Sequence, residues 1–245
     1  MRIVSPQNVS LANARIVAPL SMARITQGQT AANTLRVFTD ILPPYLGEPT
    51  NDVSLLLTTD LYLHNAQEPA ATLYDRLLQN NLSFRSGWKK KVQQAAQRTD
   101  LALPFYPKAF GCLEWINVVT ADPADFQTDR QTLARLYQKD ATFFSLVNRD
   151  IESFHRKVGP DTVAFILEEI VGTHRMFMGN VPLHTHLSDA TGNIVLTYPG
   201  HPPHSLPYGL EKLQGRRRDL PQMLFICTRP DRVEQIYELQ KTRPV

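Results

Sequence analysis

The 245-residue sequence has few cysteines, no long apolar segment and little net charge. Its two cysteines, Cys112 and Cys227, are too few for a disulfide framework or a four-thiolate zinc site, so we expect both thiols to be reduced and buried. No apolar run approaches the roughly 20 residues that cross a bilayer, and the N-terminus lacks the layout of a signal peptide. We therefore expect a cytoplasmic protein without membrane segments.

The common signatures of nucleotide-dependent and hydrolytic enzymes are also missing. The sequence contains no G-x-G-x-x-G, no G-x-x-x-x-G-K-[ST] and no G-x-S-x-G pattern, which argues against nucleotide-cofactor enzymes and ordinary α/β-hydrolases. Four histidines, His184, His186, His201 and His204, lie in proline-rich sequence without a carboxylate or cysteine at a metal-binding spacing. We therefore expect neither a metal ion nor a cofactor.

The formal net charge is +3, which is too small to identify a polyanionic partner. Its distribution is more informative, because basic residues form two runs, at 89–91 and at 216–218. The hydrophobic share of 42% is typical of a globular protein, and no Gly-, Ser- or Pro-rich linker divides the chain. We expect a single domain over residues 1–245, and a monomer.

The first predicted secondary-structure element is an apolar run that ends in Ser21. Residues 16–20 predict a buried parallel strand, residues 30–42 a helix with apolar positions at helical spacing, and residues 53–57 a second buried strand. This order is a βαβ unit, so Ser21 and Asp60 are expected at the same edge of the sheet, where ligands bind in open α/β folds. Alternatively, Ser21 only caps the following helix.

The rest of the chain continues the alternation of helices and strands. We predict further strands at 116–119, 194–197 and 223–227, and helices at 69–82, 84–98, 128–154, 161–176 and 231–239. The fold class predicted is therefore α/β, with a parallel sheet flanked by helices.

Two helices contain residues that suggest chemistry. In the helix at 84–98, Arg85, Lys89, Lys90, Lys91 and Arg98 accompany Trp88, Val92 and Ala95, which gives a basic face for phosphate contacts or simply for solubility. In the helix at 161–176, Glu168 and Glu169 interrupt apolar sequence, so at least one carboxylate is expected to face the core or a cleft.

Taken together, these segments resemble the cyclodipeptide synthases, which make cyclic dipeptides from two aminoacyl-tRNAs. Residues 17–21 resemble the nucleophile segment of that family, and Tyr198-Pro199 matches the Tyr-Pro dipeptide of one of its two subgroups. Residues 165–169 are similar to the family's Y-x-x-x-E helix, which puts Glu169 at its glutamate. Residues 137–143 and 224–230 resemble a further helix and the last strand.

The resemblance has departures. Phe165 and Phe126 stand where the family has active-site tyrosines, so neither residue can fill a role that needs a tyrosine hydroxyl. Arg24 occupies a variable position after the nucleophile, as in the Tyr-Pro subgroup. The acidic residues Asp60, Glu168 and Glu169 also fit a divergent branch that uses arginine.

The resemblance implies a Rossmann-like fold similar to the catalytic domain of class I aminoacyl-tRNA synthetases, and a ping-pong mechanism. Ser21 takes the first aminoacyl group, the amine of the second aminoacyl-tRNA attacks that ester, and the dipeptidyl-enzyme cyclises. Glu169 holds the substrate ammonium, Tyr198 donates to an oxyanion or relays a proton, and the helix at 84–98 contacts tRNA. Arg24, Asp60, Phe126, Phe165 and Pro199 bind substrate.

Two other functions remain compatible with the residues. One is a serine acyltransferase or hydrolase that acts on a small ester, and the other is a non-catalytic tRNA-binding module in which Ser21 is a helix cap.

Overall fold

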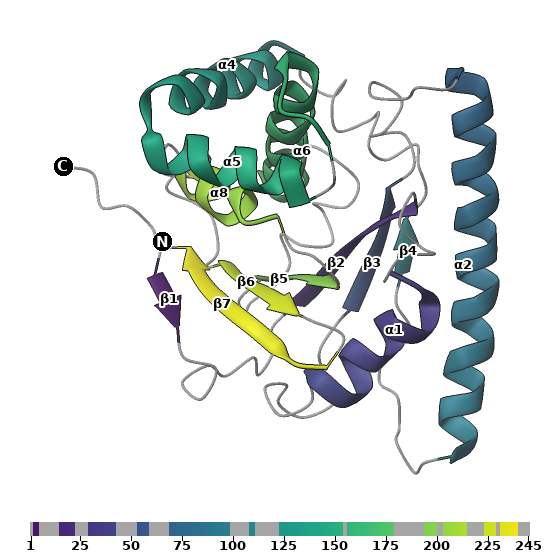
Figure 1. Cartoon of the computed structure of the whole chain (residues 1–245). Helices are drawn as coiled ribbons and strands as arrows, with labels where there is room; N and C mark the ends of the chain where they lie inside the picture. The colour runs from purple at the N-terminus through teal and green to yellow at the C-terminus, as the bar shows by residue number, and fades with distance from the viewer. Residues whose placement is uncertain are drawn as a thin grey trace.

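The structure of the chain is a computed structural model that describes residues 2–4, 15–22, 29–42, 53–58, 69–98, 108–110, 123–153, 156–178, 194–199, 203–214, 223–228 and 231–239. Figure 1 shows its elements. In chain order they are β1 (Arg2–Val4), β2 (Arg15–Ser21), α1 (Ala31–Arg36), the π-helical turn η3 (Val37–Ile41), β3 (Val53–Thr58), α2 (Ala70–Arg98), β4 (Lys108–Phe110), α4 (Pro123–Lys139), α5 (Ala141–Ser153), α6 (Pro160–Met178), β5 (Ile194–Pro199), α8 (Ser205–Gln214), β6 (Met223–Thr228) and β7 (Val233–Leu239).

A seven-stranded sheet runs through the molecule in the order β1-β7-β6-β5-β2-β3-β4. The strands from β6 to β4 pair in parallel, whereas β7 is antiparallel to β6 and β1 is antiparallel to β7. The predicted βαβ unit is present, with β2 and β3 in register from Ile16 opposite Val53 to Ser21 opposite Thr58. The sheet is thus mixed, and the prediction of a parallel sheet fails at the β7–β1 edge.

Each face of the sheet supports its own hydrophobic core, because successive side chains of a strand point to opposite faces. The first core joins one face to α4, α5, α6 and α8, and the second joins the other face to α1, η3 and α2. In β2, Val17 belongs to the first core, whereas Ile16, Ala18 and Leu20 belong to the second. A buried strand that serves two cores must be apolar throughout, as residues 16–20 are.

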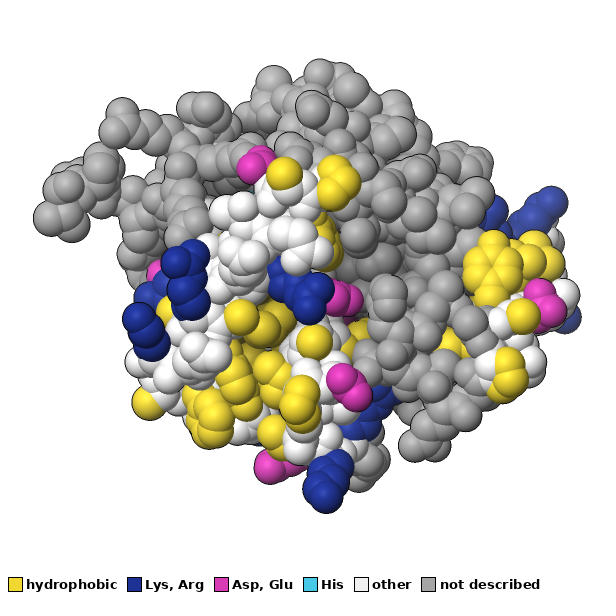
Figure 2. Space-filling model, turned by 90° about the horizontal axis from the view of Figure 1, so that it is seen from above, with side chains coloured by type: hydrophobic (Ala, Val, Ile, Leu, Met, Phe, Trp, Pro, Cys, Tyr) yellow, Lys and Arg dark blue, Asp and Glu magenta, His cyan; other side chains and the backbone are white. Residues whose placement is uncertain are grey.

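The first core lies under a compact layer of helices. Figure 1 shows α4, α5, α6 and α8 stacked together above the sheet, with α2 on the β4 side of the molecule. Seen from above in Figure 2, hydrophobic side chains gather on this helical layer and are bordered by Lys, Arg, Asp and Glu. None of the helices in the described part of the chain is both long enough and apolar enough to cross a membrane.

Two helix predictions have the wrong boundaries. The helices predicted at 69–82 and 84–98 form one helix, α2, because residue 83 is a serine that does not break a helix and Phe84 is buried in the second core. The helix predicted at 128–154 is two helices, α4 and α5. They separate at Asp140, whose Oδ1 accepts a hydrogen bond from Phe143 N at 3.0 Å and so caps α5.

The last predicted helix is wrong in type. Residues 233–239 form β7, a strand between β6 and β1 whose Ile236 packs in the second core and whose Tyr237 packs in the first. Neighbouring residues that face opposite cores require a strand, and the pairing with β6 supplies its hydrogen bonds. Strands β1 and β4 and helix α8 were not predicted from the sequence, and the strand predicted at 116–119 lies outside the described residues.

Candidate active site

Ser21 is the last residue of β2 and its side chain is only 1% exposed. Because Ser21 follows Val17 by four strand positions, both side chains point to the face covered by α4, α5, α6 and α8. Among the described residues, Ser21 Oγ has no hydrogen-bond partner. The cap of α1 is instead Thr30, whose Oγ1 accepts from Asn33 N at 3.1 Å, so the helix-cap alternative does not apply to α1.

The strand order places Ser21 at the point of the sheet where the order of the strands reverses. From β2 the chain proceeds to β3 and β4 on one side, and its later strands β5 and β6 lie on the other side. In open α/β sheets, ligands bind outside the carboxyl ends of the strands at such a reversal. Tyr198 and Pro199 end β5, the neighbour of β2, and pair with Cys227 and Thr228 of β6. The backbones of Ser21, Tyr198 and Pro199 are thus at one sheet edge.

The two glutamates of α6 have different environments. Glu168 Oε1 lies 3.2 Å from Arg130 Nη1 of α4, and its side chain is 19% exposed. Glu169 is buried, with 8% exposure, between the core residues Leu167 and Ile170. The prediction that at least one of these carboxylates faces inward is confirmed for Glu169. The structure leaves its function as a prediction.

Charged groups also fix α6 against α4. Asp129 Oδ2 lies 3.3 Å from His174 Nδ1 and 3.6 Å from Arg175 Nε, and Asp125 Oδ2 lies 3.4 Å from Arg175 Nη2. These are ion-pair distances without the alignment of hydrogen bonds. Because the His174 and Arg175 side chains are only 4% and 8% exposed, they depend on the aspartates of α4, and the pairs hold the helix that carries Glu169.

A buried carboxylate also joins α5 to α8. Asp150 is 1% exposed, and it accepts hydrogen bonds from His204 N at 2.8 Å and Ser205 N at 2.7 Å. These amides lie at the N-terminus of α8, where helix N–H groups lack partners within the helix. Burial raises the pKa of Asp150 above its ordinary value, and the hydrogen bonds only partly oppose this effect.

Phe126 and Phe165 are both buried in the first core, with 4% and 5% exposure. The guanidinium of Arg156 lies 5.5 Å above the ring of Phe165. Their apolar surroundings suit phenylalanine, and any contact of either ring with substrate remains a prediction. Arg24 and Asp60, the other predicted substrate-binding residues, lie outside the described residues.

The predicted basic residues lie on α2. Arg85, Lys89, Lys90 and Lys91 are exposed, and Arg98 is the last residue of the helix. Lys91 follows the buried Phe84 by seven residues, so its backbone lies on the same side of the helix as Phe84 although its side chain is exposed. The alternative basic run, 216–218, lies outside the described residues.

Two residues that interact with the backbone next to Ser21 were not predicted from the sequence. Gln29 is 3% exposed, and its Oε1 accepts a hydrogen bond from Ser21 N at 2.6 Å. Asn80 of α2 donates from Nδ2 to the carbonyl oxygen of Met22 at 2.9 Å. Asn80 could have been noticed, because it interrupts the apolar positions between Leu77 and Phe84, but nothing in the sequence relates Gln29 to Ser21.

The described residues include no cluster of histidine, cysteine, aspartate or glutamate that could hold a metal ion. No protein-family model and no curated protein matches the sequence.

Solved structures do resemble the chain. A CDPS from Fluoribacter dumoffii is 10% identical with a TM-score of 0.51, over 86% of this chain and 88% of that one. AlbC, a cyclodipeptide synthase from Streptomyces noursei, is 11% identical with a TM-score of 0.47, over 89% and 96% of the two chains. A CDPS from Staphylococcus haemolyticus is 8% identical with a TM-score of 0.47, over 94% and 92%. The first of these likenesses shows that this chain shares the fold of the Fluoribacter protein.

Proposed function

We propose that this chain is a tRNA-dependent cyclodipeptide synthase that works through an aminoacyl-serine intermediate on Ser21. The observation that carries the proposal is the Ser21 hydroxyl, which is buried and has no partner among the described residues, at the carboxyl edge where the strand order reverses. The fold is shared with a protein described as a CDPS, the abbreviation of cyclodipeptide synthase. The resemblance of residues 17–21, 165–169 and 198–199 to that family adds independent support.

The first half-reaction is an acyl transfer. Ser21 Oγ attacks the ester carbonyl of an aminoacyl-tRNA, the bond from that carbonyl to the tRNA oxygen breaks, and the proton of Ser21 ends on the released tRNA hydroxyl. Because the substrate is already an ester, the reaction needs no ATP, and the absence of nucleotide-binding motifs is consistent with it. We also propose the Rossmann-like relationship to class I aminoacyl-tRNA synthetases and the assignment to the Tyr-Pro subgroup that the resemblance implies.

The second step, which forms the dipeptidyl-enzyme, must differ from the step expected from the resemblance, because the bonds that form and break there do not leave the dipeptide on Ser21. If the amine of the second aminoacyl-tRNA attacked the Ser21 ester, Ser21 would be released and the dipeptide would remain on tRNA. A dipeptidyl-enzyme forms only when the amine of aminoacyl-Ser21 attacks the second tRNA ester and displaces that tRNA. The new terminal amine then attacks the Ser21 ester, which closes the ring and restores the hydroxyl.

Glu169 and Tyr198 have complementary tasks in this scheme. The carboxylate of Glu169 binds the ammonium of the first aminoacyl group and takes the proton that its amine must lose before it attacks. The hydroxyl of Tyr198 donates to the oxyanion that develops on each ester carbonyl. Both tasks are proposals that single substitutions can test.

The position of the basic residues favours tRNA over a small ester. Asn80 of α2 contacts Met22, directly after Ser21. At about 1.5 Å per helical residue, Lys89 lies roughly 14 Å and Arg98 roughly 27 Å farther along α2. A small ester bound at Ser21 cannot use charge at that distance, whereas the phosphates of a tRNA stem can.

The decisive experiment is expression in a bacterial host, with mass spectrometry of cyclic dipeptides in the medium. Purified protein incubated with aminoacyl-tRNA should also carry one aminoacyl group on Ser21. Ser21→Ala should abolish both signals and still fold, because removal of an unpartnered hydroxyl leaves no other buried group unpaired.

Two results would contradict the proposal. If activity survives in the Ser21→Ala variant, the covalent mechanism is wrong. If activity is insensitive to removal of the tRNA by RNase, the substrate is a small ester and the chain is a hydrolase or acyltransferase of another kind.

A further inference from the structure

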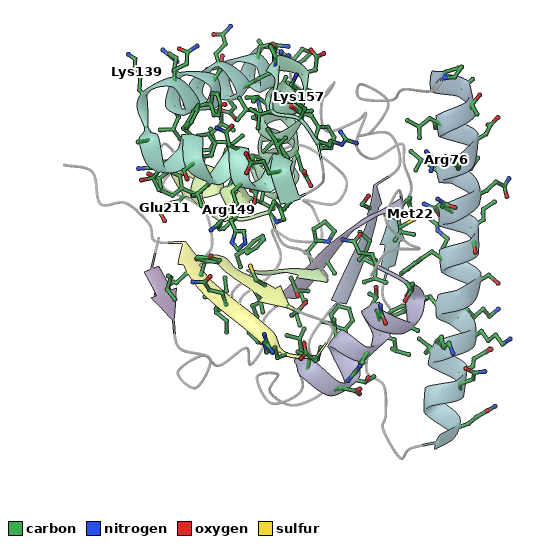
Figure 3. All side chains as sticks on the ribbon, viewed as in Figure 1. Met22, Arg76, Lys139, Arg149, Lys157 and Glu211 are labelled. Carbon is green, nitrogen blue, oxygen red and sulfur yellow. The ribbon has the colours of Figure 1, made fainter. Side chains whose placement is uncertain are left out.

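Two side-chain amides hold the backbone on either side of the Ser21–Met22 peptide bond. Gln29 Oε1 accepts from Ser21 N at 2.6 Å, and Asn80 Nδ2 donates to Met22 O at 2.9 Å. The two amides come from different parts of the chain, because Gln29 precedes α1 and Asn80 belongs to α2. We call Gln29 and Asn80 together the amide pair. In Figure 3, Met22 lies between the sheet and α2.

The sheet itself does not supply the bond that Gln29 makes. The paired residues of β2 and β5 run only from Arg15 to Val17 on β2, four residues short of Ser21. Backbone N–H groups two residues apart point to the same side of a strand, so Pro19, which has no N–H, and Ser21 share this side. A proline is tolerated there because no neighbouring strand needs its hydrogen bond.

The bond of Gln29 to Ser21 also restricts the chemistry. In acyl transfer, a backbone N–H at the nucleophile is a frequent donor to the oxyanion. Here the Ser21 N–H is already used inside the protein at 2.6 Å. The oxyanion donor must therefore be another group, which is consistent with the assignment of Tyr198. The contribution of Gln29 is the fixed position of the nucleophile.

We propose that Gln29 and Asn80 are positioning residues for Ser21. Gln29 fixes its N–H, and Asn80 fixes the carbonyl of the next residue from the helix that carries the basic side chains. This inference rests on the proposed function, because it assumes that Ser21 is the nucleophile. A misplaced nucleophile slows the chemical step without weakening the binding of substrate.

The test uses Gln29→Met and Asn80→Leu, which keep the side-chain volume and remove the hydrogen bond. The rate of aminoacylation of Ser21 in a single turnover, at saturating aminoacyl-tRNA, should fall by about 10- to 100-fold in each variant. The dissociation constant for aminoacyl-tRNA should stay within about twofold. Thr34→Val is the matched control, because Thr34 is fully buried on α1 and its Oγ1 has no partner among the described residues. This control should acylate at the wild-type rate.

Two measurements separate positioning from a general loss of structure. Hydrogen exchange at the Ser21 amide should become faster in Gln29→Met, whereas exchange in β6 should not change. Gln29→Glu retains an acceptor for Ser21 N, so it should acylate faster than Gln29→Met when the two variants have equal melting temperatures. If Gln29→Glu is as slow as Gln29→Met under that condition, the acceptor is not the important feature and the inference is wrong.

The remaining outcomes are also distinct. If both variants acylate Ser21 at the wild-type rate while the Ser21 amide exchanges faster, the amide pair does not position the nucleophile and the proposed function stands. If the wild-type protein itself never becomes acylated on Ser21, the proposed function is wrong and the inference is overturned with it.

Discussion

Glu168 and Glu169 show how one residue of helical rotation changes what a carboxylate can do. A rotation of about 100° separates neighbouring residues of an α-helix. Glu168 therefore reaches Arg130 on the neighbouring helix, whereas Glu169 is buried among core residues of α6. A buried carboxylate is costly without compensating charges or hydrogen bonds, and under the proposed function the ammonium of an aminoacyl group is one of the groups that Glu169 would bind.

We expect Glu169→Gln to reduce synthesis of the cyclic dipeptide by at least about 100-fold while the protein remains folded. Glu168→Gln is the control, since it removes only a partly exposed ion pair and should cost at most about 1 kcal/mol of stability. Steady-state synthesis and thermal unfolding of both variants provide the measurement. A large loss of activity in Glu168→Gln with none in Glu169→Gln would mean that the resemblance is misaligned by one residue.

Gly209 of α8 packs tightly against α6. A Cβ atom at this position would lie 2.7 Å from Ile170 Cγ2, and Ile170 is buried. We expect Gly209→Ala to lower the free energy of unfolding by about 1 to 3 kcal/mol, because overpacking outweighs the better helix propensity of alanine.

Gly87 of α2 is the matched control. Among the described residues, the added Cβ there would meet only Ala31 Cβ, at 3.5 Å, so Gly87→Ala should raise stability by about 0.5 to 1 kcal/mol. Urea unfolding of Gly209→Ala and Gly87→Ala measures the two changes in the free energy of unfolding. Equal effects would show that α6 and α8 separate without cost.

Among the elements, α2 has two different tasks along its length. Its first half supplies Leu73 and Leu77 to the second core and Asn80 to Met22, whereas its second half presents the exposed Lys89, Lys90 and Lys91. A 29-residue helix is rigid enough to connect these two regions. Under the proposed function, the same element would position the nucleophile and contact the tRNA backbone.

The triple variant Lys89→Ala, Lys90→Ala, Lys91→Ala should bind tRNA more weakly and with a smaller dependence on salt. Each lost phosphate contact lowers the slope of log affinity against log salt by about 0.7 to 0.9. The control removes the same charge from the helical layer, through alanines at Lys139, Arg149 and Lys157, which are labelled in Figure 3 far from α2. If the first triple variant keeps the wild-type slope, the tRNA binds elsewhere.

The junction of α4, α5 and α8 depends on pH through Asp140 and Tyr208. The Tyr208 hydroxyl donates to Asp140 Oδ2 at 2.7 Å, which lowers the pKa of Asp140. Burial, together with this bond, raises the pKa of Tyr208 from 10.0 to about 12. The raised pKa stabilises the fold fully below pH 10, and this contribution disappears as the pH rises toward 12. Conversely, the contribution of Asp140 is present above its ordinary pKa of 3.8 and is lost as the pH falls through the lowered value.

An ultraviolet titration should therefore detect one tyrosine with a pKa of about 12 that is absent in Tyr208→Phe. Asp140→Asn should move this pKa back toward 10.0, because the charge that opposes ionisation is removed while asparagine can still cap α5. A Tyr208 pKa that is the same in the Asp140→Asn variant would contradict the assigned hydrogen bond.

At the scale of the whole molecule, the two cores share one sheet. Phe143 anchors the first core and Phe38 the second, and both are almost completely buried. Strand β2 contributes Val17 to one core and Ala18 to the other, so neither core can lose its packing without disturbing the same strand. Two cores on a common central sheet should unfold as one cooperative unit.

Phe143→Ala should destabilise the protein by about 3 to 5 kcal/mol, and the fluorescence of Trp88 should report the full shift of the urea midpoint. Trp88 packs against Phe38 and Phe84 of the second core, so it senses the first core only through the sheet. Both measurements use a Trp115→Phe background, so that Trp88 is the only tryptophan that fluoresces. The urea midpoint from far-ultraviolet circular dichroism should equal the urea midpoint from Trp88 fluorescence. If Phe143→Ala leaves the urea midpoint of Trp88 fluorescence unchanged, the two cores belong to independent domains and the single domain predicted from the sequence is wrong.

The sequence by itself determined the central strands and the edge at which Ser21 lies. Residues 16–20 are apolar at every position, as a strand buried on both faces requires, and the helix that follows ends before a second strand of the same kind. The burial of one of the two glutamates in α6 could be predicted for the same reason, since an apolar helix has no polar face for both.

Only the tertiary structure decided which distant residues meet. The type of β7 depends on its pairing with β6, and the partners of Ser21 and Met22 come from positions 8 and 58 residues away. The contacts of His174 and Arg175 with the aspartates of α4 likewise depend on how α4 packs against α6. Local periodicity reports which face of an element is buried, whereas hydrogen bonds between elements are set by the packing of those faces, and no short stretch of sequence contains that information.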